Sequence, residues 1–247
     1  MLTLEQVKKK SAARLNGLHS VVKQAAELLI ERSYDRGVPI VITQGLRSIE
    51  EQNALYAQGR TQTQLNSVGL SHVSPRPGAI VTNAIGGTSY HNFGLAIDFA
   101  LLMPDGKNVS WDMRRDGDFD KTFDWLEVVE EAKKIGFAWG GDWKSFKDYP
   151  HFEMTFGLSL SQLRVGVKPA QSKVDAELNK INSLKKAGVK KVEQQKVKVL
   201  VNGKKVADGY LDGGSTYTPS REVAEALGAS VRWDKENLTV HITKEEK

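Results

Sequence analysis

Two short stretches of the sequence carry side chains that could act together chemically. The first, SYHNFGLAIDFAL (residues 89–101), places His91 and Asp98 seven residues apart in an otherwise apolar run. The second, DYPHFE, contains Asp148 and His151, three residues apart. Two imidazoles and one carboxylate, with a further carboxylate nearby, match a catalytic zinc site, which uses three protein ligands and keeps one position open. The spacing therefore suggests zinc-assisted hydrolysis.

Zinc would make hydroxide available at neutral pH, because it lowers the pKa of its bound water to about 7. Asp148 is then the expected general base, which would pass the proton to a leaving amine. Spacing alone leaves open that both histidines are ordinary structural residues of strands. The sequence has no cysteine, so disulfides, thiolate metal sites and cysteine nucleophiles are excluded, and any metal must be held by histidine and carboxylate.

His91 and Asp98 can share one site only if the chain bends between them. In a regular strand, residues seven apart face opposite sides, because side chains alternate with period two. Gly94 can supply the bend, since glycine adopts backbone angles closed to other residues. After it, LAIDFAL alternates as a strand that turns its large apolar residues to the core and Asp98 to the other face.

The remaining periodicity predicts the elements that must carry these residues. Thr-x-x-Gln at residues 3–6 and Ser-x-x-Glu at 48–51 have the spacing of capping boxes, each followed by a helix. Apolar residues three to four apart predict further helices in VVKQAAELLIERS and in DFDKTFDWLEVVEEAKKIG. VPIVITQG and HFEMTF are expected to be strands. Residues 60–88 are rich in Gly, Pro, Ser, Thr and Asn, which predicts a long loop.

Charge and composition divide the chain. With 247 residues, it is long enough for one ordinary domain and a smaller one. The net charge is +5, but residues 165–205 contain eleven lysines against three acidic residues. A basic segment beside a mildly acidic remainder suggests a polyanionic partner, and a solvated linker explains it equally well. We expect a catalytic domain over 1–164, a lysine-rich linker over 165–195 and a small module over 196–247.

The motifs resemble a known family of zinc peptidases. SYHNFGLAIDFAL fits the Ser-x-His-x-x-Gly-x-Ala-x-Asp motif, and DYPHFE fits the acid-x-x-His motif, of the peptidases that include D-Ala-D-Ala carboxypeptidases and relatives of hedgehog and lysostaphin. QGLRSIEEQNALYAQGRT, PGAIVTNA and GGDWKSFKDYPHFE are similar to L-alanyl-D-glutamate endopeptidases, which occur as phage endolysins and as autolysins of bacilli. The likeness covers about residues 1–156.

This resemblance implies a peptidoglycan-degrading endopeptidase that hydrolyses the L-Ala–D-Glu bond of stem peptides. A D,D- or L,D-carboxypeptidase that trims the ends of stem peptides is the alternative. The implied fold class is α+β, with a small antiparallel sheet, helices packed around it and a zinc site.

Carried over by position, the resemblance also implies the zinc ligands and the catalytic acid/base. His91, Asp98 and His151 would bind zinc, and Asp148 would be the acid/base. One departure is that TQTQLNSVGLSHVSPR lengthens the loop before PGAIVTNA. His72 lies in this added segment and matches no ligand position.

Three further residues would act on the substrate. Arg47 would stabilise the oxyanion or bind a substrate carboxylate, a role that suits a planar, permanently charged guanidinium. Gln52 and Ser89 would position the substrate. Trp139 and Trp143 are expected to pack in the core, with a wall of the substrate site as the alternative.

The C-terminal residues suggest a β-β-α-β-β module. Asn-Gly between the alternating runs of VKVLVNGKKV is typical of a hairpin. VNGKKV, PSREVAEALGASVRWD and LTVHI resemble the domain named for the N-terminal stalk of copper amine oxidases. His241 stands alone there, so we expect no copper site. The implied role is binding to the cell wall, and anionic wall polymers are possible partners of this module and the lysine-rich segment.

Two other functions are alternatives to hydrolysis. A non-catalytic wall-binding protein would retain the fold without a complete ligand set. A nucleic-acid binder would act through the lysines, but no aromatic-basic platform accompanies them, so no nucleic-acid partner is expected. No run approaches ~18 apolar residues, so no membrane span is expected. The N-terminus lacks the features of a secretory signal. The protein is therefore expected to be made in the host cytoplasm and to act on the wall after release by phage lysis, or in the extracellular space.

Overall fold

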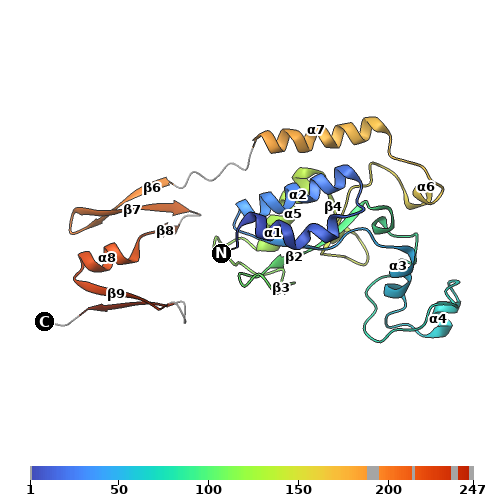
Figure 1. Cartoon of the computed structure of the whole chain (residues 1–247), viewed down its shortest axis with the longest axis horizontal. Helices are drawn as coiled ribbons and strands as arrows, with labels where there is room; N and C mark the ends of the chain where they lie inside the picture. Colours follow the sequence, from blue (N-terminus) through green and yellow to red (C-terminus); the bar gives the residue numbers. More distant parts are fainter. Residues whose placement is uncertain (1, 188–194, 213–214, 235–238, 245–247) are drawn as a thin grey trace. The chain divides into compact units, whose positions relative to one another are not determined.

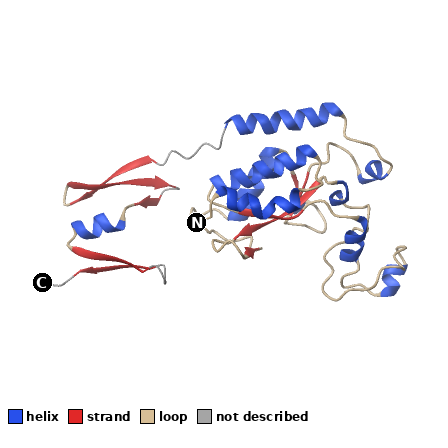
Figure 2. Cartoon of the chain, viewed as in Figure 1, coloured by secondary structure: helices blue, strands red, loops and turns tan. Residues whose placement is uncertain are grey.

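The structure, a computed structural model of the chain, describes residues 2–187, 195–212, 215–234 and 239–244. The chain divides into two compact units, of which the first comprises Met1–Asp118 and Thr122–Val189 and the second the remaining residues. Helices surround a sheet in the first unit, and strands dominate the second (Figures 1 and 2). The expected α+β class is confirmed. In the described part of the chain, no helix has the length and apolar character to cross a membrane.

The sheet of the first unit is antiparallel throughout, as expected. Its strands follow the order β1 (Ile40–Gln44), β2 (Ala96–Leu102), β5 (His151–Glu153) and β4 (Ala138–Trp139), and β3 (Val109–Ser110) pairs with the end of β2. Strands far apart in the sequence therefore lie side by side. In particular, β2 and β5 bring together the two stretches that contain the histidines.

The two faces of this sheet have different environments. Ile97, Phe99 and Phe152 are fully buried in the main core, where the rings of Phe99 and Phe152 stack with centroids 5.0 Å apart. Because side chains alternate along a strand, Asp98 and His151 point to the opposite face. The apolar face holds the sheet in place, and the other face is free to carry polar side chains.

Three helices cover the apolar face. They are α1 (Leu4–Ser11), α2 (Ser20–Asp35) and α5 (Asp124–Ile135) (Figure 1). The predicted capping box of α1 is confirmed, and the turn η1 (Ala12–Leu15) follows it. α5 begins later than its apolar pattern predicts.

The late start of α5 has a backbone cause. Phe119 and Lys121 adopt positive φ angles of 65° and 74°, which are incompatible with a right-handed helix. The end of the helix is as expected, because Gly136 caps it with a φ of 124°.

A network of ion pairs joins α2 to α5. Arg36 donates to Glu127 over 2.8 Å and to Glu130 over 2.7 Å, and Arg32 donates to Glu131. Burial opposes the charged form of Glu131, but hydrogen bonds from Arg32 and Lys134 outweigh this effect and lower its pKa. The charges therefore reinforce the packing of the two helices over the sheet.

Helix α3 (Ile49–Tyr56) begins at the predicted capping box of Ser48 and Glu51. The segment that follows differs from the long loop expected over residues 60–88. It contains the helix α4 (Gln62–Asn66), which begins at a capping box between Thr61 and Gln64. A small separate core forms around α4 from Ala57, Leu65 and Leu70, with Tyr56, Val73 and Ile85 against it.

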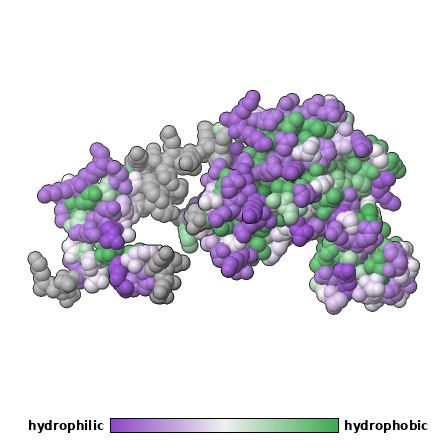
Figure 3. All heavy atoms as spheres, viewed as in Figure 1, coloured by the Kyte–Doolittle hydropathy of each residue, from purple (hydrophilic) through white to green (hydrophobic). Residues whose placement is uncertain are grey.

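The linker expected over residues 165–195 is wrong for residues 171–187. After the short helix α6 (Leu160–Arg164), α7 (Gln171–Ala187) packs against α2 and α5 in the first unit. One face of α7 is apolar at helical spacing, with Ile181 fully buried, and the surface over the helix is mainly hydrophilic in Figure 3. Because lysines occupy the outer face, the overall composition of the segment is polar and does not reveal this apolar stripe. Its members are Val174, Leu178, Ile181 and Leu184.

The described residues of the second unit form two antiparallel sheets and a helix. The predicted Asn-Gly hairpin is confirmed, because Asn202 and Gly203 adopt φ angles of 49° and 77°, both positive as a type I′ turn requires. A third strand, absent from the predicted β-β-α-β-β order, extends the first sheet. The elements are β6 (Gln195–Val201), β7 (Lys204–Asp212), β8 (Ser215–Tyr217), α8 (Ser220–Ala226), β9 (Ala229–Asp234) and β10 (Thr239–Lys244).

Candidate metal centre

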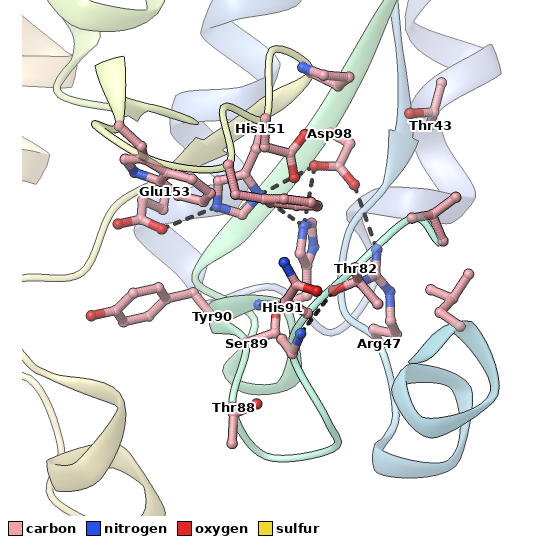
Figure 4. A pocket seen from close by; sticks show the side chains of 18 of the residues that line it. Thr43, Arg47, Thr82, Thr88, Ser89, Tyr90, His91, Asp98, His151 and Glu153 are labelled. Atoms are coloured by element: carbon pink, nitrogen blue, oxygen red, sulfur yellow. Dashed lines mark hydrogen bonds and ion pairs between the residues drawn. The ribbon is translucent and has the colours of Figure 1, made fainter. Parts of the chain in front are cut away.

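Three side chains from separate parts of the chain meet on the polar face of the sheet (Figure 4). His91 Nε2 lies 3.1 Å from His151 Nδ1 and 3.2 Å from Asp98 Oδ1, and His151 Nδ1 lies 3.3 Å from the same carboxylate oxygen. All three side chains are largely buried. The structure therefore brings together the three residues that the sequence singled out, with one ligand atom of each pointing at a common centre.

Strand pairing positions two of the three. Asp98 of β2 and His151 of β5 are direct cross-strand partners. On the other side of β2, the pairing with β1 contains a bulge between Ile42 and Gln44, next to Asp98. Bulges redirect side chains and are frequent beside active sites. The register of the sheet thus decides that the carboxylate and the imidazole face each other.

His91 reaches the centre from the turn η2 (Tyr90–Phe93), which precedes β2. The turn ends at Gly94 with a φ of 66°, so the predicted bend is confirmed. A Cβ atom at Gly94 would lie 2.7 Å from the Gly17 carbonyl oxygen, which adds a steric reason for glycine. The bend lets His91 fold back over Asp98.

The arrangement fits a metal ion. Bonds of about 2.0–2.1 Å in a tetrahedral zinc centre place ligand atoms roughly 3.3 Å apart, close to the separations found between these three atoms. Each ring is also held on its far side, since His91 Nδ1 lies 2.8 Å from the Gly45 carbonyl oxygen and His151 Nε2 lies 3.0 Å from Glu153 Oε2. Such outer partners orient metal-binding imidazoles. The His/Asp/His group can therefore hold a metal ion.

The charges of the centre also favour the binding of a cation. Burial opposes the ionised form of Asp98, but the two imidazoles outweigh it and hold its pKa well below the usual range. Burial likewise opposes the charged form of His151, yet hydrogen bonds with Asp98 and Glu153 raise its pKa to about 9. The site is thus a place where the protein stabilises positive charge beside an ionised carboxylate.

Asp148 lies on the loop that leads into β5, beside the three ligands. The turn η3 (Gly140–Asp142) holds this loop, because the Asp148 amide donates to the Gly140 carbonyl oxygen over 3.2 Å. Burial and the negative charge of Asp98 raise the pKa of Asp148. A half-buried carboxyl group with a raised pKa is suited to take up and release a proton.

Arg47 is buried next to Asp98, with Nη2 3.5 Å from Asp98 Oδ2. Its Nη1 donates to Gln52 Oε1 over 2.8 Å, and within the described part of the chain its Nε has no hydrogen-bond partner. Gln52 is fully buried and donates in turn to the Ala84 carbonyl oxygen over 2.8 Å. Gln52, which the resemblance expects to position the substrate, therefore lies behind Arg47 and contacts that side chain rather than lining the pocket.

The other predicted residues take different positions. Ser89 lines the pocket and caps η2 through a 3.4 Å contact of its Oγ with the His91 amide. Trp143 also lines the pocket, with its ring 5.1 Å from that of His151, so the alternative of a wall residue describes it better than core packing. Trp139 packs against the main core as expected. His72 is exposed, away from the centre.

A pocket of about 660 Å³ opens over the three ligands. The sequence analysis did not predict several residues of this pocket, above all Glu153. Glu153 follows His151 by two residues in a strand, so both side chains lie on one face, and this spacing could have identified it. Exposed aromatic residues also escaped notice, because nothing in the sequence marks the side of a loop that faces a pocket. The pocket residues not predicted include Thr82, Tyr90, Trp111, Phe146 and Glu153.

Comparisons with known proteins match both parts of the chain. The family described as D-alanyl-D-alanine carboxypeptidase matches residues 82–154, which include the three ligands and Asp148. The copper amine oxidase N-terminal domain matches residues 200–247.

The individual relatives that match are named as L-alanyl-D-glutamate peptidases or endopeptidases. The chain is 53% identical over 137 residues to the peptidoglycan L-alanyl-D-glutamate endopeptidase CwlK of Bacillus subtilis, covering 56% of this chain and 73% of that protein. It is 29% identical over 205 residues to the L-alanyl-D-glutamate peptidase of Listeria phage A118, covering 81% of this chain and 60% of that protein. Among solved structures, the Serratia marcescens L-Ala D-Glu endopeptidase ChiX has 28% identity and a TM-score of 0.36, with 60% of this chain and 87% of that chain covered.

Proposed function

Because the chain belongs to the family of peptidoglycan L-alanyl-D-glutamate endopeptidases, we propose that it is a zinc peptidase that hydrolyses the L-Ala–D-Glu bond in the stem peptides of bacterial peptidoglycan. The convergence of His91 Nε2, Asp98 Oδ1 and His151 Nδ1, 3.1–3.3 Å apart, carries this proposal. Bound by these atoms, zinc would supply a Lewis acid and lower the pKa of a water ligand to about 7.

Asp148 is the proposed acid/base. Its carboxylate takes a proton from the attacking water and delivers it to the nitrogen of D-Glu as the amide C–N bond breaks. The carbonyl carbon of L-Ala gains the hydroxyl group, and the new amine gains the proton. The raised pKa supports the first half of this role, because it makes the carboxylate a stronger base toward the attacking water.

Arg47 is the proposed binder of negative charge on the substrate. The side chain lines the pocket beside Asp98, with Nη2 3.5 Å from Asp98 Oδ2, and its Nε has no hydrogen-bond partner among the described residues. A guanidinium held in one orientation can stabilise the developing oxyanion or bind the carboxylate of D-Glu. Gln52 acts through Arg47 by fixing its other edge, and Ser89 acts by capping the turn that carries His91.

The runner-up is a D,D- or L,D-carboxypeptidase that trims the ends of stem peptides. It needs the same catalytic groups and differs in the bond that is placed over them. Mass spectrometry of digested peptidoglycan separates the two, because the endopeptidase exposes N-terminal D-Glu and the carboxypeptidase releases free D-Ala. The names of the relatives favour the endopeptidase.

Replacement of one ligand tests the metal-dependent activity. His151→Ala removes an imidazole from the centre, so both zinc binding and release of new amino groups from purified cell walls should be abolished. His72→Ala is the matched control, because His72 is exposed and outside the site, and it should retain both properties. Persistent lysis by His151→Ala, or undiminished lysis by the wild type after thorough chelation, would refute the proposal.

The two units have separate proposed roles. The first unit, with the pocket, performs hydrolysis, and the second unit holds the enzyme on the wall. The four lysines on the described part of α7 are exposed, namely Lys173, Lys180, Lys185 and Lys186. We propose that they and the second unit contact anionic wall polymer, because clustered basic side chains favour polyanionic surfaces.

A further inference from the structure

Glu153 lies on the far side of the His151 ring from Asp98 (Figure 4). Its Oε2 is 3.0 Å from His151 Nε2, and the side chain is only 14% exposed. His151 and Glu153 are two residues apart on β5 and share one face of the strand, while Phe152 between them is buried in the core. The backbone alone therefore directs Glu153 toward the histidine.

The position of Glu153 is tightly constrained. β5 is paired on both edges, so the backbone at Glu153 is held between Ala96 of β2 and Ala138 of β4. A carboxylate in such a place loses most of its water, and a buried charge is costly unless it has a partner. In the described part of the chain, this carboxylate forms its hydrogen bond with His151.

An ionised carboxylate can only accept hydrogen bonds, so the His151 proton must lie on Nε2. In the neutral form that a metal ligand requires, the imidazole carries one proton, which leaves the lone pair of Nδ1 directed at His91 Nε2 and Asp98 Oδ1. His91 has the complementary arrangement, because its Nδ1 faces the Gly45 carbonyl oxygen and its Nε2 faces the centre.

We propose that Glu153 is a positioning residue for the metal centre: it fixes the tautomer and the ring orientation in which His151 presents Nδ1 to the metal. This inference rests on the proposed zinc site. The two rings differ in an instructive way, since the acceptor for His91 is a backbone carbonyl that no substitution removes. The acceptor for His151 is a side chain, so its contribution can be measured.

The test is the zinc affinity of purified full-length protein, measured by competition with a chromophoric chelator. Glu153→Leu removes the acceptor and should weaken zinc binding by about 10- to 100-fold, the usual effect of losing such a partner. Glu153→Gln keeps an amide oxygen that can accept from Nε2 but loses the charge, so its affinity should be intermediate. Thr155→Val is the control, two residues further along, and should bind zinc like the wild type.

A spectroscopic measurement separates positioning from general destabilisation. In the zinc-loaded wild type, long-range ¹⁵N–¹H spectra should show a proton on His151 Nε2 with the shift of a strong hydrogen bond, and Glu153→Leu should lose that shift. Thermal unfolding of the metal-free proteins reports whether each variant folds, and Glu153→Gln carries the test if Glu153→Leu does not.

The outcomes are distinct. If the wild type binds zinc and both Glu153 variants bind it equally well, the role of Glu153 is refuted and the proposed function stands. If the wild type itself does not bind zinc, the metal centre fails, and the proposed function fails with it. Graded loss in the order wild type, Glu153→Gln, Glu153→Leu supports the inference.

Discussion

The chemistry of individual residues depends here on what lies behind them. His91 and His151 present different ring nitrogens to one point, and each does so because an acceptor holds its other nitrogen. Asp98 remains ionised because two imidazoles surround it, although burial alone would favour its neutral form. The pKa of Asp148, which lies in the same pocket, is shifted in the opposite direction by burial and by the charge of Asp98. Two carboxylates in one pocket can therefore serve as ligand and as proton carrier.

Asp148→Asn should separate proton transfer from metal binding. The amide cannot accept the proton, so kcat should fall about 10²- to 10⁴-fold, the usual contribution of a general base. Zinc affinity should change little, because Asp148 is not one of the converging ligands. Asp142→Asn is the control on the same loop, where an exposed side chain pairs with Lys133, and it should leave kcat unchanged. Equal rates for Asp148→Asn and the wild type would remove Asp148 from the mechanism.

At the scale of elements, the two faces of the sheet have different roles. The face covered by α1, α2 and α5 supplies the core, and the other face supplies Asp98, His151 and Glu153. The ion pairs between α2 and α5 stabilise the packing of these two helices over the core, and they do not contact the pocket. Stability and catalysis can therefore be altered separately.

Glu131→Gln should make stability less dependent on pH in the acid range. The pKa of Glu131 is lower in the folded protein than its ordinary 4.5, so its ionisation stabilises the fold above that pH. This contribution is lost as the pH falls through the lowered pKa. At pH 7 the variant should lose about 1–3 kcal/mol, the usual cost of removing one partner of a buried charged hydrogen bond. The difference from the wild type should shrink toward pH 3.

Urea unfolding at several pH values measures this effect. Glu222→Gln, an exposed residue of the second unit, is the control and should not change the unfolding of the first unit. A constant difference between Glu131→Gln and the wild type at all pH values would contradict the prediction.

Helix α7 should contribute to the stability of the first unit. Ile181→Ala removes a fully buried side chain, which typically costs about 2–5 kcal/mol. Asn182→Ala, at the exposed neighbouring position, should have little effect. Thermal unfolding compares the two variants. Unfolding of Ile181→Ala at the wild-type temperature would contradict the packing of α7 against α2 and α5.

At the scale of the whole molecule, we propose that the first unit performs hydrolysis and the second unit attaches the enzyme to the wall. The boundary matters for any truncation, because the first unit reaches Val189 and includes α7. A protein ending at residue 187 should hydrolyse small soluble muropeptides at the rate of the full chain. A protein ending at residue 164 should be less stable, because it lacks α7 and therefore exposes the apolar surface that α7 covers.

The protein ending at residue 187 should bind purified walls about tenfold more weakly or worse, as expected when one of two attachment points is lost. Sedimentation with walls over a range of salt concentrations measures this. If the lysines act electrostatically, binding of the full chain should fall as salt rises. Undiminished wall binding by the shorter protein at low salt would count against a targeting role for the second unit.

The described architecture was largely predictable wherever local chemistry decides it. The capping boxes at Thr3 and Ser48, the bend at Gly94 and the Asn-Gly hairpin all follow from side-chain types at fixed spacing. Composition predicts a linker where α7 lies, because it averages over both faces of the helix. The lysines of the outer face outweigh an apolar stripe that includes Ile181.

The sequence by itself determined the donor set: with no cysteine and few histidines, only imidazole and carboxylate were available, and the motifs identified which ones. Tertiary structure alone decided that Asp98 and His151 are cross-strand partners, that Gln52 lies behind Arg47, and that Glu153 holds the His151 ring. The physical reason is that strand register and burial arise from contacts between segments some fifty residues apart. Side-chain types fix what a group can do, but only the packed chain fixes which nitrogen or oxygen faces which partner.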